Sequence, residues 1–378
     1  MATGKGSGTG RAAVFLGPRR LEVMEFPLPP VEEGGILVKV TAAGICGSDL
    51  HYWRGEMRPL IAGRPGPFIL GHELTGVVYA LGRGVATDSL GRPLKEGDRV
   101  VFPYFFPCRR CYLCTRGELN LCPQRFRFRR SIEEYPYCNG GFADYFYLFP
   151  GHFVFKAPDD LSDEALTPLN CALAQVVYGL QKGGVRMGDA VVIQGAGGLG
   201  LYAVAVAKEM GAGLVIAIDG VPARLEMAKQ CGADYVLDIT QLQDPQERVA
   251  RVKELTGYRG GADVVVEVVG YPQVVPEGLE MLRRGGTYVE IGNIWPGSTV
   301  TLDMSRILFG TTTIVPTAHY DPYVLVQALD FLTRTKDKYP LTRIASHKFP
   351  LERIAEAFEV AEWRGRPTAV TRAIITLS

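Results

Sequence analysis

Two kinds of segment alternate through the second half of the chain. Short apolar runs rich in valine and isoleucine, at 190–194 and 262–270, are separated by stretches such as 222–230 that have a helical pattern. The unbroken valines at 264–266 are typical of a strand that is buried on both faces. This alternation predicts an α/β fold with a doubly wound parallel sheet, which should be complete by about residue 313.

The rest of the chain has a different pattern. Short strands broken by proline and glycine, including 36–40, occupy the first part, and apolar-periodic helices are expected at 323–333 and 352–364. A closing strand is predicted at 371–377. The first 11 residues, rich in glycine, serine and threonine, are expected to form a mobile tail. A length of 378 residues is too great for one ordinary core and predicts two domains.

Composition excludes several classes of protein. A formal net charge of +1 gives no electrostatic case for nucleic acid or an anionic membrane as partner. No apolar run approaches the roughly 18 residues that a membrane-spanning helix needs. The N-terminus lacks the apolar core of a signal peptide, so a cytoplasmic protein is expected. In such a protein the 8 cysteines point to metal binding or catalysis before disulfides.

A glycine-rich turn follows the predicted strand at 190–194 and precedes a helical stretch. It has the form G-x-G-x-x-G and comprises Gly195, Gly197, Gly198, Leu199 and Gly200. Glycines at this spacing allow a tight turn, close approach of a pyrophosphate and close packing of helix on strand. Asp219 ends the next strand, 19 residues after Gly200, where a carboxylate can bind both hydroxyls of an adenine ribose. The segment predicts a dinucleotide site.

Three residues far apart in the sequence suit a catalytic zinc ion. Cys46 follows a strand end, His72 lies in an apolar run next to Glu73, and Cys171 begins an apolar, helix-compatible segment. Two thiolates and one imidazole bind zinc and leave a fourth position for water or substrate. Glu73 or Asp49 would orient these ligands.

A second group of cysteines is compact in sequence. Its members form a C-x2-C-x2-C-x7-C array of Cys108, Cys111, Cys114 and Cys122. Four thiolates on one loop can close the tetrahedral shell of a structural zinc ion. An iron–sulfur cluster and disulfides are alternatives, although the last spacing is longer than in ferredoxins. The arginine-rich segment 125–130 is expected to be a solvated face or a subunit contact.

Together these motifs resemble the zinc-containing medium-chain dehydrogenase/reductase family, typified by alcohol dehydrogenases. The residues that carry the resemblance are the four-cysteine lobe, the dinucleotide turn and a glycine-spaced segment with Gly71, His72, Glu73, Gly76 and Gly82. The resemblance implies a GroES-like β-barrel catalytic domain made of 1–171 and 317–378, with 104–140 as the structural zinc lobe. A Rossmann NAD-binding domain would occupy 172–316.

The resemblance also implies roles for single residues. Cys46, His72 and Cys171 would hold the catalytic zinc, with Glu73 as a ligand in some states, and the four-cysteine array the structural zinc. Ser48 would pass the alcohol proton to His51 at the protein surface. The remaining assignments are to the cofactor site: Gln175 near the nicotinamide, Arg372 on the pyrophosphate, and Arg224 and Gly292 along the cofactor.

The implied reaction is reversible oxidation of an alcohol, with NAD favoured because Asp219 would repel a 2′-phosphate. Aromatic residues near the family's cleft suggest an apolar secondary or cyclic alcohol; they are Tyr52, Trp53, Phe105, Phe106, Phe153 and Trp295. A polyol or an acyl-thioester alcohol is the alternative, although Cys171 argues against the polyol branch, which uses a carboxylate as third ligand. Family members are commonly homodimers or homotetramers. A non-catalytic nucleotide sensor would be expected to lack a ligand or Ser48, and none is missing.

Overall fold

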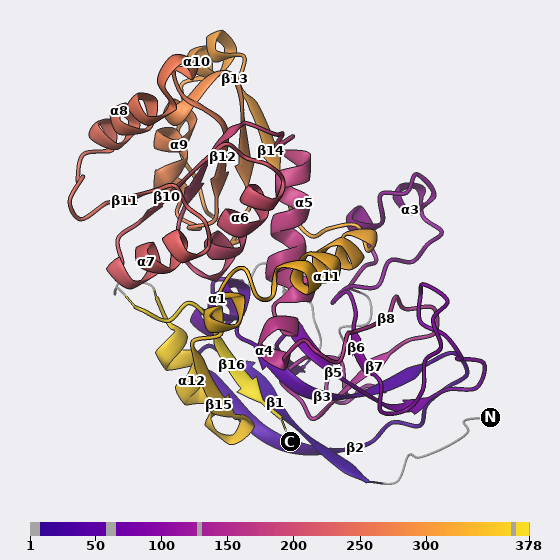
Figure 1. Ribbon diagram of the computed structural model, residues 1–378. Coiled ribbons are helices and arrows are strands. Elements are labelled where there is room, and N and C mark those ends of the chain that lie inside the picture. The colour runs from indigo at the N-terminus through magenta and orange to yellow at the C-terminus, as the bar shows by residue number, and fades with distance from the viewer. Residues whose placement is uncertain (1–7, 58–65, 127–130, 364–367, 378) are drawn as a thin grey trace.

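The computed structural model describes residues 8–57, 66–126, 131–363 and 368–377, and its chain forms two sheet-based regions side by side (Figure 1). One region contains a six-stranded sheet in the order β11-β10-β9-β12-β13-β14, in which every pair is parallel. Its strands are β9 (Ala190–Gln194), β10 (Leu214–Asp219), β11 (Tyr235–Asp238), β12 (Ala262–Glu267), β13 (Leu282–Glu290) and β14 (Thr313–Pro316). The predicted doubly wound sheet is confirmed, and its strand order reverses between β9 and β12.

Helices cover both faces of this sheet because successive strand residues point to opposite sides. Val191 and Ile193 of β9 belong to one apolar core, and Val192 belongs to another. The helices in this half are α5 (Ala174–Lys182), α6 (Gly198–Glu209), α7 (Pro222–Gln230), α8 (Pro245–Thr256), α9 (Val275–Met281), α10 (Met304–Gly310) and α11 (Tyr323–Thr335). The first core includes residues of α5, α6 and α11, and the second includes residues of α8 and α9.

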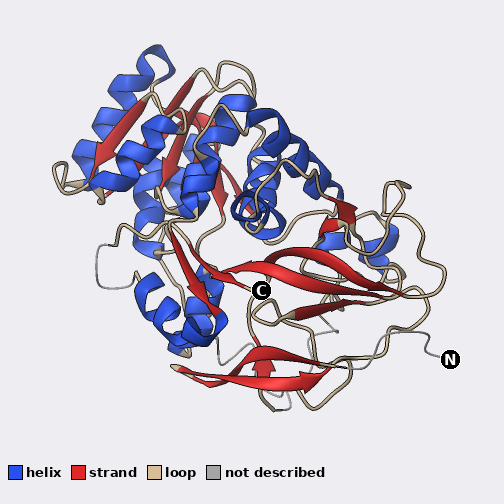
Figure 2. Cartoon of the chain, turned by 60° about the horizontal axis from the view of Figure 1, so that its bottom comes forward, coloured by secondary structure: helices blue, strands red, loops and turns tan. Residues whose placement is uncertain are grey.

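The second region is built on a seven-stranded sheet that joins both ends of the chain (Figure 2). Strand β16 pairs antiparallel with β3, placing Ile375 opposite Ala43. The strands are β3 (Ile36–Gly44), β5 (Glu73–Leu81), β6 (Arg99–Val101), β7 (Tyr145–Leu148), β8 (Phe155–Lys156), β15 (His347–Pro350) and β16 (Ala373–Thr376). Helices α1 (Gly47–Arg54), α3 (Tyr112–Thr115), α4 (Asp163–Leu166) and α12 (Ile354–Ala361) belong to this half.

A small sheet of β1 (Thr9–Gly17), β2 (Arg20–Pro27) and β4 (Phe68–Ile69) completes this half. The expectation of a mobile tail over residues 1–11 is wrong for its last part. Thr9 pairs with Pro27 in the ladder, and the Arg11 guanidinium donates to Asp144 at 2.9 Å. Residues 1–7 lie outside the described residues. No helix in the described part of the chain is both long and apolar enough to cross a membrane.

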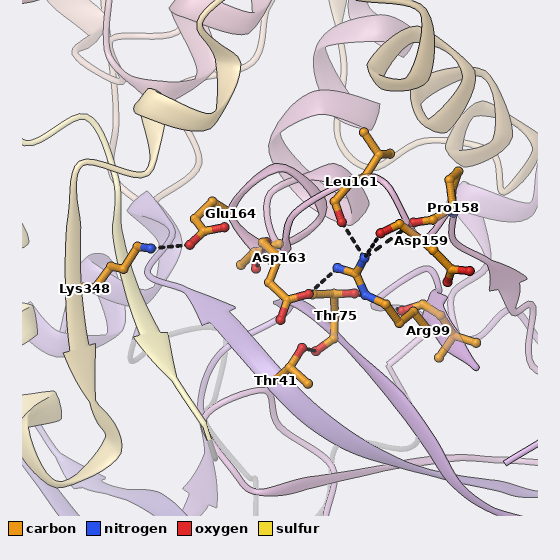
Figure 3. Close-up of polar contacts among 11 residues, drawn as sticks. Thr41, Thr75, Arg99, Pro158, Asp159, Leu161, Asp163, Glu164 and Lys348 are labelled. Atoms are coloured by element: carbon orange, nitrogen blue, oxygen red, sulfur yellow. Dashed lines mark hydrogen bonds and ion pairs between the residues drawn. The ribbon is translucent and has the colours of Figure 1, made fainter. Parts of the chain in front are cut away.

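Polar contacts fix the segment that crosses from one region to the other (Figure 3). The Arg99 guanidinium, from β6, pairs with Asp163. It also donates to the carbonyl oxygens of Pro158, Asp159 and Leu161. Lys348 of β15 pairs with Glu164 on the other side. The segment then runs through α4 into a π-helical turn, Leu169–Leu173. The helix predicted at Cys171 therefore begins with a wider turn, of a kind that is frequent at functional sites.

Candidate functional site

Four buried side chains converge where β3 ends and β5 begins. Cys46, His72, Glu73 and Cys171 each offer a ligand atom, and these atoms lie within 4.8 Å of one another. Cys46 lies two residues after the end of β3, and the β3–β5 register places Gly44 opposite Glu73. A Cβ at Gly44 would lie 2.7 Å from a carboxylate oxygen of Glu73, so only glycine leaves room for this side chain. The π-helical turn brings Cys171 to the same point.

Asp49 holds two of these residues in place. Cys46 is the N-cap of α1, and the Asp49 carboxylate accepts a hydrogen bond from its backbone N–H at 3.0 Å. The other carboxylate oxygen accepts from Gly71 N–H at 3.3 Å and lies 3.6 Å from Nδ1 of His72. Burial favours neutral His72, but the negative charges of Asp49 and Cys46 raise the pKa of His72 to about 9. The Asp49 carboxylate thus holds the Cys46 backbone and the His72 ring in position.

The chemistry of this donor set fits zinc. A hydrogen bond from Cys171 and the charge of His72 lower the pKa of Cys46 well below its ordinary value. The same hydrogen bond raises the pKa of Cys171. The pair therefore favours a state in which Cys46 is the thiolate and Cys171 keeps its proton. Two sulfurs and one imidazole are ligands that zinc prefers. One carboxylate oxygen of Glu73 is buried and has no hydrogen-bond partner among the described residues, which adds a fourth donor.

Glu73 also connects the cluster to the glycine-rich turn. Its second carboxylate oxygen accepts from Arg372, and both side chains are buried. The Arg372 guanidinium borders the turn, since a Cβ at Gly198 would lie 3.0 Å from its Nη2 atom. Its Nε atom is buried without a partner among the described residues. A phosphate beside the turn would supply the missing acceptor.

The other cysteine group forms a lobe beside α3. The sulfurs of Cys108, Cys111, Cys114 and Cys122 lie within 4.8 Å of one another, and Cys122 accepts from the Cys108 N–H at 3.3 Å. Backbone hydrogen bonds lower the pKa of Cys108 to about 6, whereas burial raises the pKa of Cys114 to about 12. All eight cysteines are described, and none forms a disulfide. Four sulfurs this close together fit the closed shell of a structural metal site.

The glycine-rich turn has the geometry of a dinucleotide site. Gly195 has φ +97°, which an L-residue with a side chain rarely adopts. A Cβ at Gly200 would lie 2.8 Å from the Gly195 carbonyl carbon, whereas one at Gly197 would meet no atom closer than 3.9 Å. Leu199 lies in the first turn of α6, whose N-terminus faces the cavity with its free N–H groups.

Asp219, at the end of β10, is fixed in the cavity wall. Its carboxylate accepts from the backbone N–H groups of Ala196, Gly220 and Val221 at 2.8 to 2.9 Å. Arg224 lies 3.8 Å away and donates to the Val370 carbonyl at 2.8 Å. These contacts orient Asp219 and place a cation next to it.

A single cavity of about 1080 Å³ joins the cysteine–histidine cluster to the turn. Ser48, His51, Gln175 and Gly292 line it as well. The Gln175 amide donates to the Thr317 carbonyl at 2.8 Å, and the Gly292 N–H donates to Glu267 at 3.0 Å. A volume of this size accommodates a dinucleotide together with a small substrate.

His51 is not at the protein surface, and that expectation is wrong. Only 3% of the residue is exposed, because the ring of Trp295 stacks on it at 6.3 Å and Trp363 meets it edge-on at 6.5 Å. Its Nδ1 atom lies 2.6 Å from a carboxylate oxygen of Glu56. Sequence reasoning missed Glu56, which has no motif of its own.

Aromatic side chains form the wall near the cluster, but they are mostly not the expected ones. Tyr52 lines the cavity as predicted, whereas Trp53, Phe105 and Phe106 are buried in the cores and do not line it, and neither does Phe153. The other aromatic lining residues are Phe68, Tyr104, Phe126, Tyr271 and Trp363.

Tyr104 and His319 form a pair that the sequence did not reveal. The Tyr104 hydroxyl lies 2.7 Å from Nδ1 of His319, and its ring contacts the His72 ring at 4.8 Å. His319 has φ +63°, a strained conformation of the kind found at functional sites. The pair places polar atoms in an otherwise aromatic wall.

The arginine-rich segment is only partly described. Arg125 and Phe126 line the cavity, so the expectation of a solvated face does not hold for them. The Arg125 guanidinium donates to the Cys122 carbonyl at 3.0 Å. Residues 127–130 lie outside the described residues.

Comparison with known proteins identifies relatives over nearly the whole chain. Residues 198–334 match the family described as zinc-binding dehydrogenase, and residues 32–159 match the alcohol dehydrogenase GroES-like domain. The chain is 35% identical to 5-exo-hydroxycamphor dehydrogenase of Pseudomonas putida, with 93% of this chain and 95% of that protein covered. It is 32% identical to erythritol/L-threitol dehydrogenase of Mycolicibacterium smegmatis, with 93% of each covered. An alcohol dehydrogenase from Thermotoga maritima has a TM-score of 0.88 at 30% identity, covering 98% of this chain and 100% of that one.

Proposed function

The chain belongs to the zinc-binding dehydrogenase family of oxidoreductases, and from that premise we propose that it reversibly oxidises an alcohol by hydride transfer to NAD. The observation that carries the proposal is the single cavity lined by both Cys46 and the glycine-rich turn. A substrate oxygen and a nicotinamide bound there would share one space. Holding the two reactants together supplies much of the rate enhancement in reactions of this kind.

Different residues of the site would bind the metal, carry the proton and bind the cofactor. Cys46, His72 and Cys171 would hold zinc, which polarises the alcohol oxygen when bound, while NAD accepts the hydride. Ser48 lies in the first turn of α1 and is placed to take the hydroxyl proton. His51 is three residues further along, on the same side of the helix, and would receive that proton. Arg372 and the N-terminus of α6 would bind the pyrophosphate, and Gln175 would lie beside the nicotinamide.

Asp219 supports NAD as the cofactor. Its carboxylate is fixed by backbone donors at the end of β10 and would accept from the ribose hydroxyls. A 2′-phosphate at the same place would meet a negative charge, with only Arg224 to offset it. We therefore propose NAD rather than NADP.

The aromatic wall supports an apolar secondary or cyclic alcohol. Tyr52, Phe68 and Phe126 present apolar ring surface in the cavity, and one relative is named for a hydroxylated camphor. The test is NADH formation with cyclohexanol and 1-phenylethanol against sorbitol and erythritol. We expect kcat/KM to be at least about tenfold higher for the two cyclic substrates, a difference of about 1.4 kcal/mol. The reverse order would refute the substrate assignment.

A polyol is the second candidate, and Glu73 is the observation that favours it. Its unpartnered carboxylate oxygen lies in the ligand cluster, and another relative is named for erythritol and threitol. Preference for sorbitol or erythritol in the same assay would establish this alternative.

We also propose the division of the chain into a catalytic domain, 1–171 and 317–378, and a NAD-binding domain, 172–316. The pairing of β16 with β3 supports the first, and the six-stranded sheet within 190–316 supports the second. Eight free thiols, most of them in two ligand clusters, support a reducing cytoplasmic setting.

A homo-oligomer is proposed from the edge of the parallel sheet. Helix α10 has no buried residue, and Met304, Leu308 and Phe309 are 67%, 72% and 71% exposed. Helix α10 contacts β13, and edge strand β14, which follows it in the chain, pairs among the described residues only with β13. Such an apolar edge is typical of a subunit contact. Phe309→Asp should convert the oligomer to monomers in sedimentation velocity; an unchanged sedimentation coefficient would place the contact elsewhere.

A further inference from the structure

Helix α1 ends in a turn that returns the chain to His51. Gly55 adopts a left-handed conformation with φ +81°, and its N–H donates to the Tyr52 carbonyl at 2.9 Å. The Glu56 N–H donates to the His51 carbonyl at 3.0 Å, which completes a Schellman motif. The motif brings the Glu56 side chain alongside His51, which is five positions earlier in the sequence.

The Glu56 contact decides which ring nitrogen of His51 carries the proton. Nδ1 lies 2.6 Å from a Glu56 carboxylate oxygen and 3.0 Å from Nη2 of Arg54. It cannot donate to the first and accept from the second at once. The contact with Glu56 is shorter and ionic, and Arg54 itself donates to Glu56 at 2.9 Å. Nδ1 therefore carries the proton, and Nε2 is the basic nitrogen.

The charges around His51 favour its protonated form. They are Arg54 at the end of α1, Glu56 in the turn after it, and Glu362 beyond α12, which accepts from Arg54 at 2.9 Å. The Glu56 carboxylate touches the His51 ring with a negative charge, and it favours the imidazolium. The rings of Trp295 and Trp363, which also pack on the His51 ring, carry no charge.

We propose that Glu56 is a positioning residue of the proton relay, an inference that rests on the proposed function. It fixes the tautomer and orientation of His51 and stabilises the imidazolium. The alcohol O–H bond breaks, its proton passes through Ser48, and an N–H bond forms at Nε2 of His51. NAD would accept the hydride when bound, and Glu56 stays ionised. At an exposed site, water would stabilise the charge of the imidazolium. The two tryptophans cover His51, so the Glu56 carboxylate stabilises this charge instead.

The test is a titration of the His51 ring by NMR in the NADH-bound enzyme. The protein has 5 histidines, so the His51 signal is assigned by its loss in His51→Gln. Glu56→Gln keeps an acceptor but removes the charge, and it should move the titration midpoint down by about one pH unit or more. Glu362→Gln is the matched control: it disturbs the same Arg54 but lies further from His51, so its shift should be smaller. The acid limb of kcat/KM for alcohol oxidation should move with the midpoint.

Two results would overturn the inference. One is an unmoved His51 midpoint in a folded Glu56→Gln protein. The other needs no variant: nitrogen shifts of the wild-type ring that place the proton on Nε2 rather than Nδ1. Failure of the proposed function is separate, because the titration requires no turnover. Absence of alcohol oxidation with a shifted midpoint would refute the reaction and keep the pairing; normal oxidation with an unmoved midpoint would refute the inference alone.

Discussion

Glycines of the turn between β9 and α6 differ in what a methyl group would meet, and this difference can be tested. At Gly200 an added Cβ would lie 2.8 Å from the carbonyl carbon of Gly195 and nearer still to its oxygen. These are backbone atoms, which no rotamer change can move. At Gly197 the nearest atom would be an Arg224 nitrogen at 3.9 Å, and φ is an ordinary −70°. Gly200→Ala should therefore disturb the fold, and Gly197→Ala only the cofactor site.

The magnitudes follow from these contacts. Overpacking costs about 1–3 kcal/mol, and collision with backbone puts Gly200→Ala near the upper end. At about 2–4 °C per kcal/mol for a domain of this size, Tm should fall by about 6–12 °C. Gly197→Ala has two opposite effects on the free energy of unfolding. Alanine restricts the unfolded chain, which stabilises the protein, but it is a poorer N-cap than glycine, and the two effects should cancel to within about 0.5 kcal/mol. Its methyl group would enter the space proposed for the pyrophosphate and weaken NADH binding at least about tenfold, or about 1.4 kcal/mol.

Two measurements on the purified variants check this reasoning. Thermal unfolding followed by circular dichroism gives Tm without cofactor, and NADH fluorescence titration gives Kd. We expect Gly200→Ala to lose stability and binding together, and Gly197→Ala to lose binding alone. A Gly200→Ala protein with the wild-type Tm would refute the packing argument. Wild-type NADH affinity in Gly197→Ala would refute the position assigned to the pyrophosphate.

Other predictions concern the metal sites, the cofactor and pH. Cys46→Ser should abolish turnover and leave NADH binding within a few-fold; an active variant would remove Cys46 from the zinc site. Cys114→Ser should lower zinc by one ion per chain in elemental analysis and reduce Tm, whereas full zinc content would exclude it as a ligand. Asp219→Ala should raise KM for NAD far more than for NADP, and an unchanged ratio would refute the ribose contact. Burial and Glu290 raise the pKa of Glu267 from 4.5 to about 8, so the folded state holds a proton that the unfolded chain releases. Stability should fall as pH rises from 4.5 to 8, and denaturant titrations of Glu267→Gln should show a smaller fall.

The sequence alone determined the local features of this protein. Alternation of apolar runs with helical stretches predicted the parallel sheet, and strand β9 and helix α7 begin and end at the predicted residues. The dinucleotide turn was recognisable because its glycines act within six residues, through the positive φ of Gly195 and close backbone approach at Gly200. The four-cysteine array was equally local. Serine and histidine each serve many functions in proteins. The resemblance to a known family was therefore needed to assign roles to Ser48 and His51.

Only the tertiary structure decided which distant residues meet. The β3–β5 register and the π-helical turn bring Cys46 within reach of Cys171, and nothing in either segment encodes that distance. Arg372 contacts Glu73 as well as the glycine-rich turn, and Trp295 covers His51. Neither contact is encoded in the local sequence. Sequence periodicity reports which face of an element is buried, but not what lies opposite that face. Contacts between distant residues depend on register and packing, which the whole chain sets together.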